Sequence, residues 1–173
     1  QVNEDYFKIE PNTDWTFLHD NTQNWTLDFW INPTTDVTSE SIEIIGTNGG
    51  GSGNIGVNMS FGSSDNTFHL VISNGNSGAH CKFKITTTSA IQNVWNQVTV
   101  VYNADNNESS NYTASKVDIY LNGVEQTVTR TFQNGSSFGG PNANAPTNEL
   151  YLFSLGSTVE DFHIDEFRII KDK

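Results

Sequence analysis

The sequence predicts an all-β protein in which two antiparallel sheets pack face to face, with no substantial helix. Three stretches indicate this fold class: NWTLDFWINP at residues 24–33, WNQVTVVYN at residues 95–103 and VDIYLNGVEQ at residues 117–126. Each alternates apolar and polar side chains, and an extended chain sends alternate side chains to opposite faces. Each stretch is therefore expected to be a strand with one buried face, as in a two-sheet sandwich.

The strand at residues 24–33 shows the alternation most clearly. Its apolar side chains share one parity and are expected in the core: Trp25, Leu27, Phe29 and Ile31. The other parity is expected to face outward: Thr26, Asp28 and Trp30. Pro33 has no backbone N–H to donate, so it marks the point where strand pairing ends.

The first strand is expected at residues 5–10, with Phe7 and Ile9 inward, and Pro11 ends it. The connection over residues 12–23 is polar but contains three large apolar side chains. Such a composition predicts a loop that packs against the core rather than a flexible one.

Short strands are expected at residues 42–45, 55–61, 68–73 and 79–86. The last three follow one another through short connections, so we expect them to be neighbours in one sheet. Residues 87–93 form a longer link, which is expected to carry the chain to the other sheet before the strand at residues 95–103.

Asn122 and Gly123 tolerate the two positive φ angles of a type I′ turn, which predicts a tight hairpin after residues 117–121. Residues 124–132 are expected to return as one strand, and residues 133–148 to be a long irregular segment. Two further strands, at residues 150–155 and 162–170, are expected to complete the sandwich.

The order of these pieces resembles that of the laminin-G-like or concanavalin A-like lectin superfamily, in its bacterial and phage form. The pieces that carry the resemblance are NEDYFKIEP, NWTLDFWINP, VWNQVTVVYN, VDIYLNG, ELYLFSLGS and FHIDEFRII. They cover nearly the whole chain, so we expect residues 1–173 to form a single domain. Because the chain starts at Gln1, we expect it to be excised from a longer protein.

This resemblance implies a jelly-roll sandwich that binds glycans or proteins, often with a calcium ion. It also implies that the first and last strands run side by side and antiparallel. A domain of this kind is expected in an extracellular setting, on a cell surface or on the surface of a virion.

Charge and composition narrow the classes of partner. The chain has 8 Lys+Arg against 20 Asp+Glu, a formal net charge of −12. Nucleic acid and anionic membranes are unfavourable partners, because binding phosphate requires a basic surface.

Cys81 is the only cysteine, so no intrachain disulfide can form. No apolar run approaches the length needed for membrane insertion.

Calcium is the metal that the sequence favours, because it takes several oxygen ligands. Asp165 shares the parity of Phe167 and Ile169, so we expect it to face inward, where a carboxylate needs a cation or strong donors. The implied pairing of the first and last strands would bring Asp14 and Asp20 close to it. The alternatives are a structural hydrogen-bond acceptor for Asp165 and solvated or capping acids for the other two.

Ligand binding is expected in loops at one rim of the sandwich, where amides would bind hydroxyls and aromatic faces would bind sugar rings. The candidates are Asn48, Asn54, Asn76, His80, Asn134, Phe138 and Asn142. Asparagine also suits tight turns, which is the simpler interpretation for each. Phe138 stands out, because no predicted strand explains an aromatic residue within GSSFGG.

Catalysis is not predicted. Hydrolases with this fold carry acidic residues at alternate positions of one strand, and the nearest match here is EDFHIDEF. Glu160 and Asp165 differ in parity, and His163 stands where an acid would be required. The chain is therefore predicted to be a non-catalytic recognition module for a glycan or other cell-surface receptor, in a phage tail fibre or an adhesin. The alternatives are a structural or interaction domain that oligomerises through its parent protein and, more distantly, a glycan hydrolase.

Overall fold

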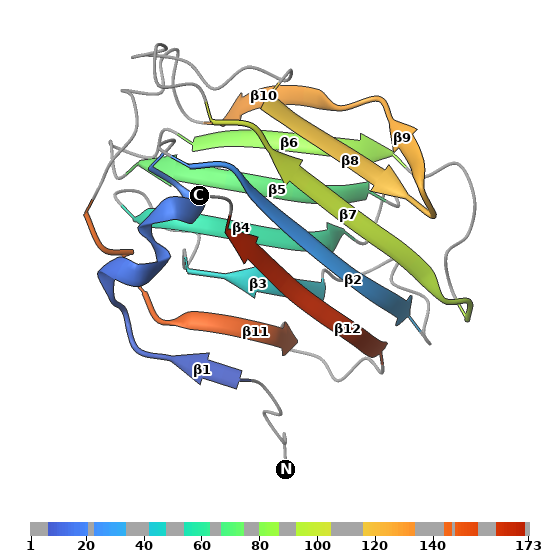
Figure 1. Ribbon diagram of the computed structural model, residues 1–173, viewed down its shortest axis with the longest axis horizontal. Helices are drawn as coiled ribbons and strands as arrows, with labels where there is room; N and C mark the ends of the chain where they lie inside the picture. Colours follow the sequence, from blue (N-terminus) through green and yellow to red (C-terminus); the bar gives the residue numbers. More distant parts are fainter. Residues whose placement is uncertain are drawn as a thin grey trace.

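The computed structural model describes residues 7–20, 23–33, 42–47, 54–62, 67–74, 80–86, 93–104, 116–133, 144–146, 148–155 and 162–171. These residues form two antiparallel sheets that lie face to face (Figure 1). The all-β, two-sheet sandwich is thereby confirmed. No helix in these ranges has the length and hydropathy required to cross a membrane.

The described strands form one sheet of seven strands and one of five. The larger sheet has the order β1 (Phe7–Ile9), β11 (Leu150–Leu155), β3 (Ile42–Gly46), β4 (Ile55–Gly62), β5 (Thr67–Asn74), β6 (His80–Thr86) and β10 (Thr129–Gln133). The smaller sheet has the order β12 (Phe162–Lys171), β2 (Trp25–Pro33), β7 (Asn96–Tyr102), β8 (Val117–Leu121) and β9 (Val124–Gln126).

Strand β2 lies between β12 and β7, and its alternation is complete. Buried and half-buried positions alternate over all nine residues. The buried parity is the predicted one, and Trp25 stacks on Tyr102 of β7 with ring centroids 5.1 Å apart and planes at 10°. Apolar side chains of the larger sheet pack on the same core, which confirms the inward face of residues 24–33.

The connections between strands are those predicted from the sequence, except for the segment after the turn at Asn122 and Gly123. Strands β4, β5 and β6 are neighbours, as expected, and the chain then moves to the smaller sheet at β7. Asn122 and Gly123 have φ angles of 52° and 76°, as a type I′ turn requires. The predicted single strand at 124–132 is wrong. It divides into β9, which pairs with β8, and β10, which pairs with β6 in the other sheet.

The connection after β1 contains η1 (Thr13–Leu18), a short 3-10 helix. The side chain of Asn12 accepts a hydrogen bond from the backbone N–H of Asp14 and so caps this helix. Phe17 and Leu18 are buried in the core, which confirms the prediction of a packed connection.

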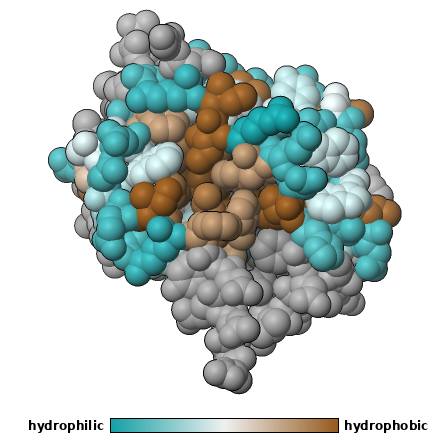
Figure 2. Space-filling view, turned by 60° about the horizontal axis from the view of Figure 1, so that its bottom comes forward, coloured by the Kyte–Doolittle hydropathy of each residue, from teal (hydrophilic) through white to brown (hydrophobic). Residues whose placement is uncertain are grey.

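Strand β1 differs from its prediction, because Phe7 and Ile9 are exposed by 69% and 40% instead of buried. The larger sheet is two strands wider, and the smaller sheet covers it only as far as β11. Near that limit the Phe153 and Phe167 rings meet edge to face with centroids 5.1 Å apart, and the Phe7 ring lies beside Phe153 with centroids 6.4 Å apart. Figure 2 is turned to bring the lower side of Figure 1 forward and shows apolar residues gathered in a strip there.

The implied pairing of the first and last strands is also wrong. Strand β1 pairs with β11, and β12 pairs with β2. The two strands belong to different sheets, so they lie at the same side of the sandwich without sharing backbone hydrogen bonds.

One strand position depends on glycine. Gly56 has a φ of +143°, and a Cβ there would meet the hydroxyl of Thr47 and lie 2.9 Å from its carbonyl oxygen. Gly123 also has a positive φ, but a Cβ there would meet nothing within 4 Å.

Gly56→Ala should therefore reduce the free energy of unfolding by about 2–4 kcal/mol and Gly123→Ala by about 1 kcal/mol, measured by urea denaturation. Equal losses would show that the clash with Thr47 is relieved without cost.

Candidate functional site

The outer face of the smaller sheet contains a shallow, open hollow of about 440 Å³. It is lined by Trp30 of β2, Trp95 just before β7, and Asp165 and Glu166 of β12. Trp95 is 46% exposed, which is a large apolar surface to leave in contact with water. The imidazole of His163 lies beside Trp95, with ring centroids 6.3 Å apart.

The order of the strands brings these residues together from three distant parts of the chain. Asp165 lies opposite Trp30 in the pairing of β12 with β2, and Trp30 lies opposite Gln97 in the pairing of β2 with β7. His163 lies opposite Asn32, one outward position further along. The hollow therefore exists only when β12, β2 and β7 are paired in this register.

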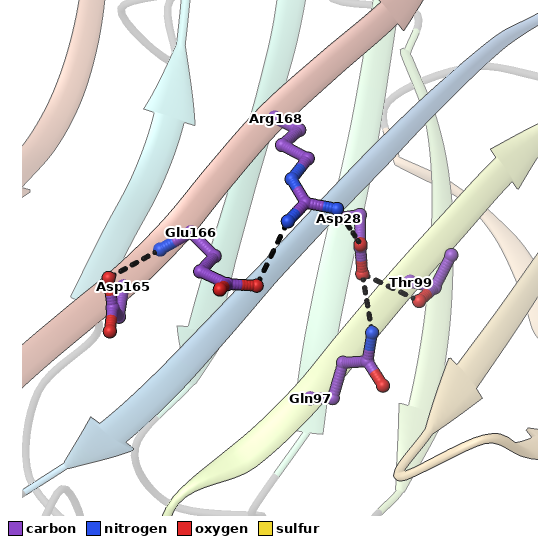
Figure 3. A network of polar contacts seen from close by, with 6 residues as sticks. All are labelled: Asp28, Gln97, Thr99, Asp165, Glu166 and Arg168. Carbon is purple, nitrogen blue, oxygen red and sulfur yellow. Dashed lines mark hydrogen bonds and ion pairs between the residues drawn. The ribbon is translucent and has the colours of Figure 1, made fainter.

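A polar network continues from the hollow across the same face (Figure 3). One carboxylate oxygen of Asp28 accepts hydrogen bonds from Gln97 at 3.1 Å and Thr99 at 2.9 Å. Arg168 lies next to it, 3.9 Å from Asp28 Oδ2 and 3.0 Å from Glu166 Oε2. The guanidinium therefore contacts two carboxylates at once, and it orients Glu166 at the border of the hollow.

The predicted inward orientation of Asp165 is wrong. It faces solvent instead of the core, because β12 contains a β-bulge between Asp165 and Arg168. Two residues, Glu166 and Phe167, stand opposite the single residue Phe29, and Glu166 has a positive φ of 51°. The extra residue reverses the parity, so that Phe167 packs against Phe29 while Asp165 points outward.

The three candidate calcium ligands do not converge. Asp165 Oδ1 accepts a hydrogen bond from the backbone N–H of Glu166 at 2.8 Å. Asp14 is exposed in η1, and Asp20, just after η1, is buried. This segment lies near the end of β12, because the Lys171 ammonium is 4.9 Å from the centroid of the Phe17 ring. Lys171 lies six positions from Asp165, which is about 20 Å along an extended strand. A single ion bound by all three acids does not fit this geometry, and the described residues contain no cluster of three His, Cys, Asp or Glu suited to a metal.

The predicted ligand-binding residues mostly fall outside the described part of the chain: Asn48, Asn76, Asn134, Phe138 and Asn142. Asn54 is half-buried before β4, and its carbonyl oxygen accepts a hydrogen bond from Ser73 Oγ at 2.6 Å. His80 begins β6 and lies opposite Ser73 in the strand pairing. These two residues therefore lie on either side of Ser73 at one end of the larger sheet, on a different sheet from the hollow.

Asp165 was predicted only as a metal ligand, and Trp30, Trp95 and Glu166 were missed, because ligand binding was expected in the loops at one rim of the sandwich. One signal was available: Trp30 has the outward parity of a strand whose other parity supplies the core. A large aromatic ring at such a position has no role in the core and suggests binding. The partners of Trp30 could not be identified without the order of the strands.

The fold and its exposed hollow define a β-sandwich of the lectin type. The profile of the Concanavalin A-like lectin/glucanases superfamily matches residues 3–173, and the chain belongs to this superfamily. The superfamily includes lectins and glucanases, so binding or hydrolysis must be argued from the site. No curated protein matches the sequence.

Solved structures with the same fold include binding domains of toxins. The binding domain of Paraclostridial Mosquitocidal Protein 1 has a TM-score of 0.60 and 13% identity, over 98% of this chain and 38% of that chain. Botulinum neurotoxin type C, whose cell entry depends on interaction with two ganglioside molecules, has a TM-score of 0.60 and 16% identity, over 95% and 36%. The binding domain of botulinum neurotoxin DC, in complex with rat synaptotagmin II, has a TM-score of 0.61 and 16% identity, over 95% and 36%. The chain thus spans little more than a third of these structures, and the likeness shows a common fold.

The bulge that turns Asp165 outward can be tested through Glu166. Glu166→Val should reduce the free energy of unfolding by about 1–2 kcal/mol, because a β-branched residue does not tolerate a positive φ. Glu166→Gly should match the wild type or exceed it by up to about 1 kcal/mol. Both variants lose the same exposed ion pair with Arg168, so urea denaturation of the two isolates the backbone effect. A valine variant at least as stable as the glycine variant would contradict the left-handed conformation.

Proposed function

We propose that this domain is a non-catalytic recognition module that binds a glycan at the hollow on the outer face of the smaller sheet. The observation that carries the proposal is the pair of tryptophans, Trp30 and Trp95, which border one solvent-facing hollow together with two carboxylates. Neither ring is part of the buried core, so their packing energy is available to a ligand.

The chemistry of the hollow suits a saccharide. The C–H face of a pyranose ring is apolar and flat enough to pack on an indole, and burying this area is favourable. Sugar hydroxyls would donate hydrogen bonds to Asp165 and Glu166, whose carboxylates can only accept. The volume of about 440 Å³ lies within the usual range for small-ligand sites.

The arrangement of the acids favours binding over hydrolysis. Glycoside hydrolysis requires one carboxyl group that is protonated and one that is ionised, on the two sides of the scissile bond. Asp28 and Glu166 each contact the Arg168 guanidinium, and Asp165 accepts a hydrogen bond from a backbone N–H, so all three carboxylates are engaged in contacts along one face of the sheet. Release of reducing sugar from a polysaccharide panel would overturn this part of the proposal.

The setting that we propose is extracellular, on a cell or virion surface, as part of a longer protein such as a phage tail fibre or an adhesin. The toxin binding domains support the fold of such a module and do not identify its ligand, because their identity to this chain is 16% or less.

A second candidate function is supported by the apolar strip beside β1. Phe7 and Ile9 of β1 are exposed, and the Phe7 ring lies beside the half-buried Phe153, which in turn meets Phe167. A strip of this kind would suit packing against another part of the parent protein or a second copy, as in a structural or interaction domain.

The glycan site should be sensitive to both tryptophans. Trp30→Ala and Trp95→Ala should each weaken binding to the glycans recognised by the wild type by about tenfold or more, measured on a glycan array and then by calorimetry. Phe7→Ala is the control, because it removes an exposed aromatic ring from the other sheet. Unchanged glycan binding by both tryptophan variants, each shown to be folded, would overturn the glycan site at the hollow.

Support of the fold by calcium stays a prediction. Saturating calcium should raise the melting temperature above that measured with a chelator if any of Asp14, Asp20 or Asp165 contributes to a site. Single Asp→Asn variants at the three positions would identify which acid is involved. An unchanged melting temperature at saturating calcium would contradict the prediction.

A further inference from the structure

We infer that the hollow selects glycans that carry a protonated amino group, such as glucosamine residues, over neutral glycans, and that it disfavours glycans that carry a carboxylate. This inference rests on the proposed glycan-binding function and names the class of saccharide. Two independent features of the hollow carry it: the balance of charge around it and the two indole rings that border it.

The first feature is the excess of negative charge. Three carboxylates, from Asp28, Asp165 and Glu166, lie on this part of the outer face with one guanidinium, that of Arg168. Arg168 contacts Asp28 and Glu166, and no cationic side chain of the described residues forms an ion pair with Asp165. The chain as a whole carries a net charge of −12, so no long-range field offsets this local excess.

The second feature is the aromatic border. The face of an indole attracts cations because of its electron distribution, and tryptophan is the strongest of the aromatic side chains in this respect. Trp30 and Trp95 border the same hollow as the two acids, so one ammonium group there can contact an indole and a carboxylate at once. A carboxylate in the same place would meet the repulsion of Asp165 and Glu166.

The hollow also has room for more than an ammonium group. A volume of about 440 Å³ is much larger than such a group needs, and two indoles offer apolar faces that a lysine side chain would cover only in part. A sugar ring that carries the amine uses both properties. We therefore place the amine on a saccharide, and a basic peptide becomes an outcome of the test.

Calorimetry with three matched ligands tests the inference: β-1,4-linked trimers of glucosamine, glucose and N-acetylglucosamine. The glucosamine trimer differs from the glucose trimer only by an ammonium in place of one hydroxyl on each ring, and acetylation removes the charge. Wild-type protein should bind the glucosamine trimer about tenfold more tightly than the glucose trimer and should not bind sialyllactose. Raising the salt from about 0.1 M to about 1 M, which shortens the Debye length from about 10 Å to about 3 Å, should reduce this preference.

The matched variants are Asp165→Asn and Glu125→Gln. Asp165→Asn keeps an oxygen to accept the Glu166 N–H and should reduce affinity for the glucosamine trimer severalfold, by a larger factor than affinity for the glucose trimer. Glu125→Gln makes the same change of charge at an exposed position of β9, in the same sheet and outside the hollow, and should leave both affinities unchanged.

The outcomes separate this inference from the function on which it rests. Equal affinity for the glucosamine and glucose trimers, or binding of sialyllactose, would overturn the inference and leave the glycan site standing. Absence of binding to any saccharide would overturn both. A trilysine peptide that binds as tightly as the glucosamine trimer, and loses affinity equally in Trp95→Ala, would overturn the assignment to a saccharide.

Discussion

The whole structure depends on the two-residue period of strand β2. One parity of this strand is completely buried and contributes Trp25 to the core, and the other parity presents Asp28 and Trp30 to solvent. A slip of one residue would move the carboxylate of Asp28 into the core, at a cost that no partner there would offset. The same alternation therefore fixes the register of the sheet and the outward position of Trp30, which lines the hollow.

Strand β12 supplies the acids of the site by breaking that period. Under strict alternation, the inward position of Phe167 would place Asp165 inward as well. The inserted residue, Glu166, takes a left-handed conformation, and both acids then lie on the outer face while Phe167 still packs on Phe29. An interruption of the ladder beside a site is a known way to re-aim side chains. Here it places on the outer face a carboxylate that strict alternation would have buried.

The fold was predictable wherever the alternation is unbroken. Strand β2, the meander of β4 to β6 and the turn at Asn122 and Gly123 follow from local patterns, because local sterics decide them. Long-range contacts decide the rest. Val124 and Thr129 belong to different strands because the first pairs with β8 and the second with β6 of the other sheet. The exposure of Phe7 depends on how far the smaller sheet extends over the larger one. The site was visible only as an outward tryptophan, because its other members come from strands whose order no local pattern specifies.

A site built on three paired strands behaves differently from one built on loops at the rim. Its side chains are held by the sheet before a ligand arrives, so less conformational entropy is lost on binding. It also depends on β12, which is the edge strand of its sheet and pairs on one side with β2 alone. Edge strands open locally at a lower free energy than central strands. Under the proposed function, a ligand that bridged Asp165 and Trp30 would require β12 to be paired, so its binding free energy would add to the stability of this strand. Recognition and the integrity of the sheet edge would then be thermodynamically linked.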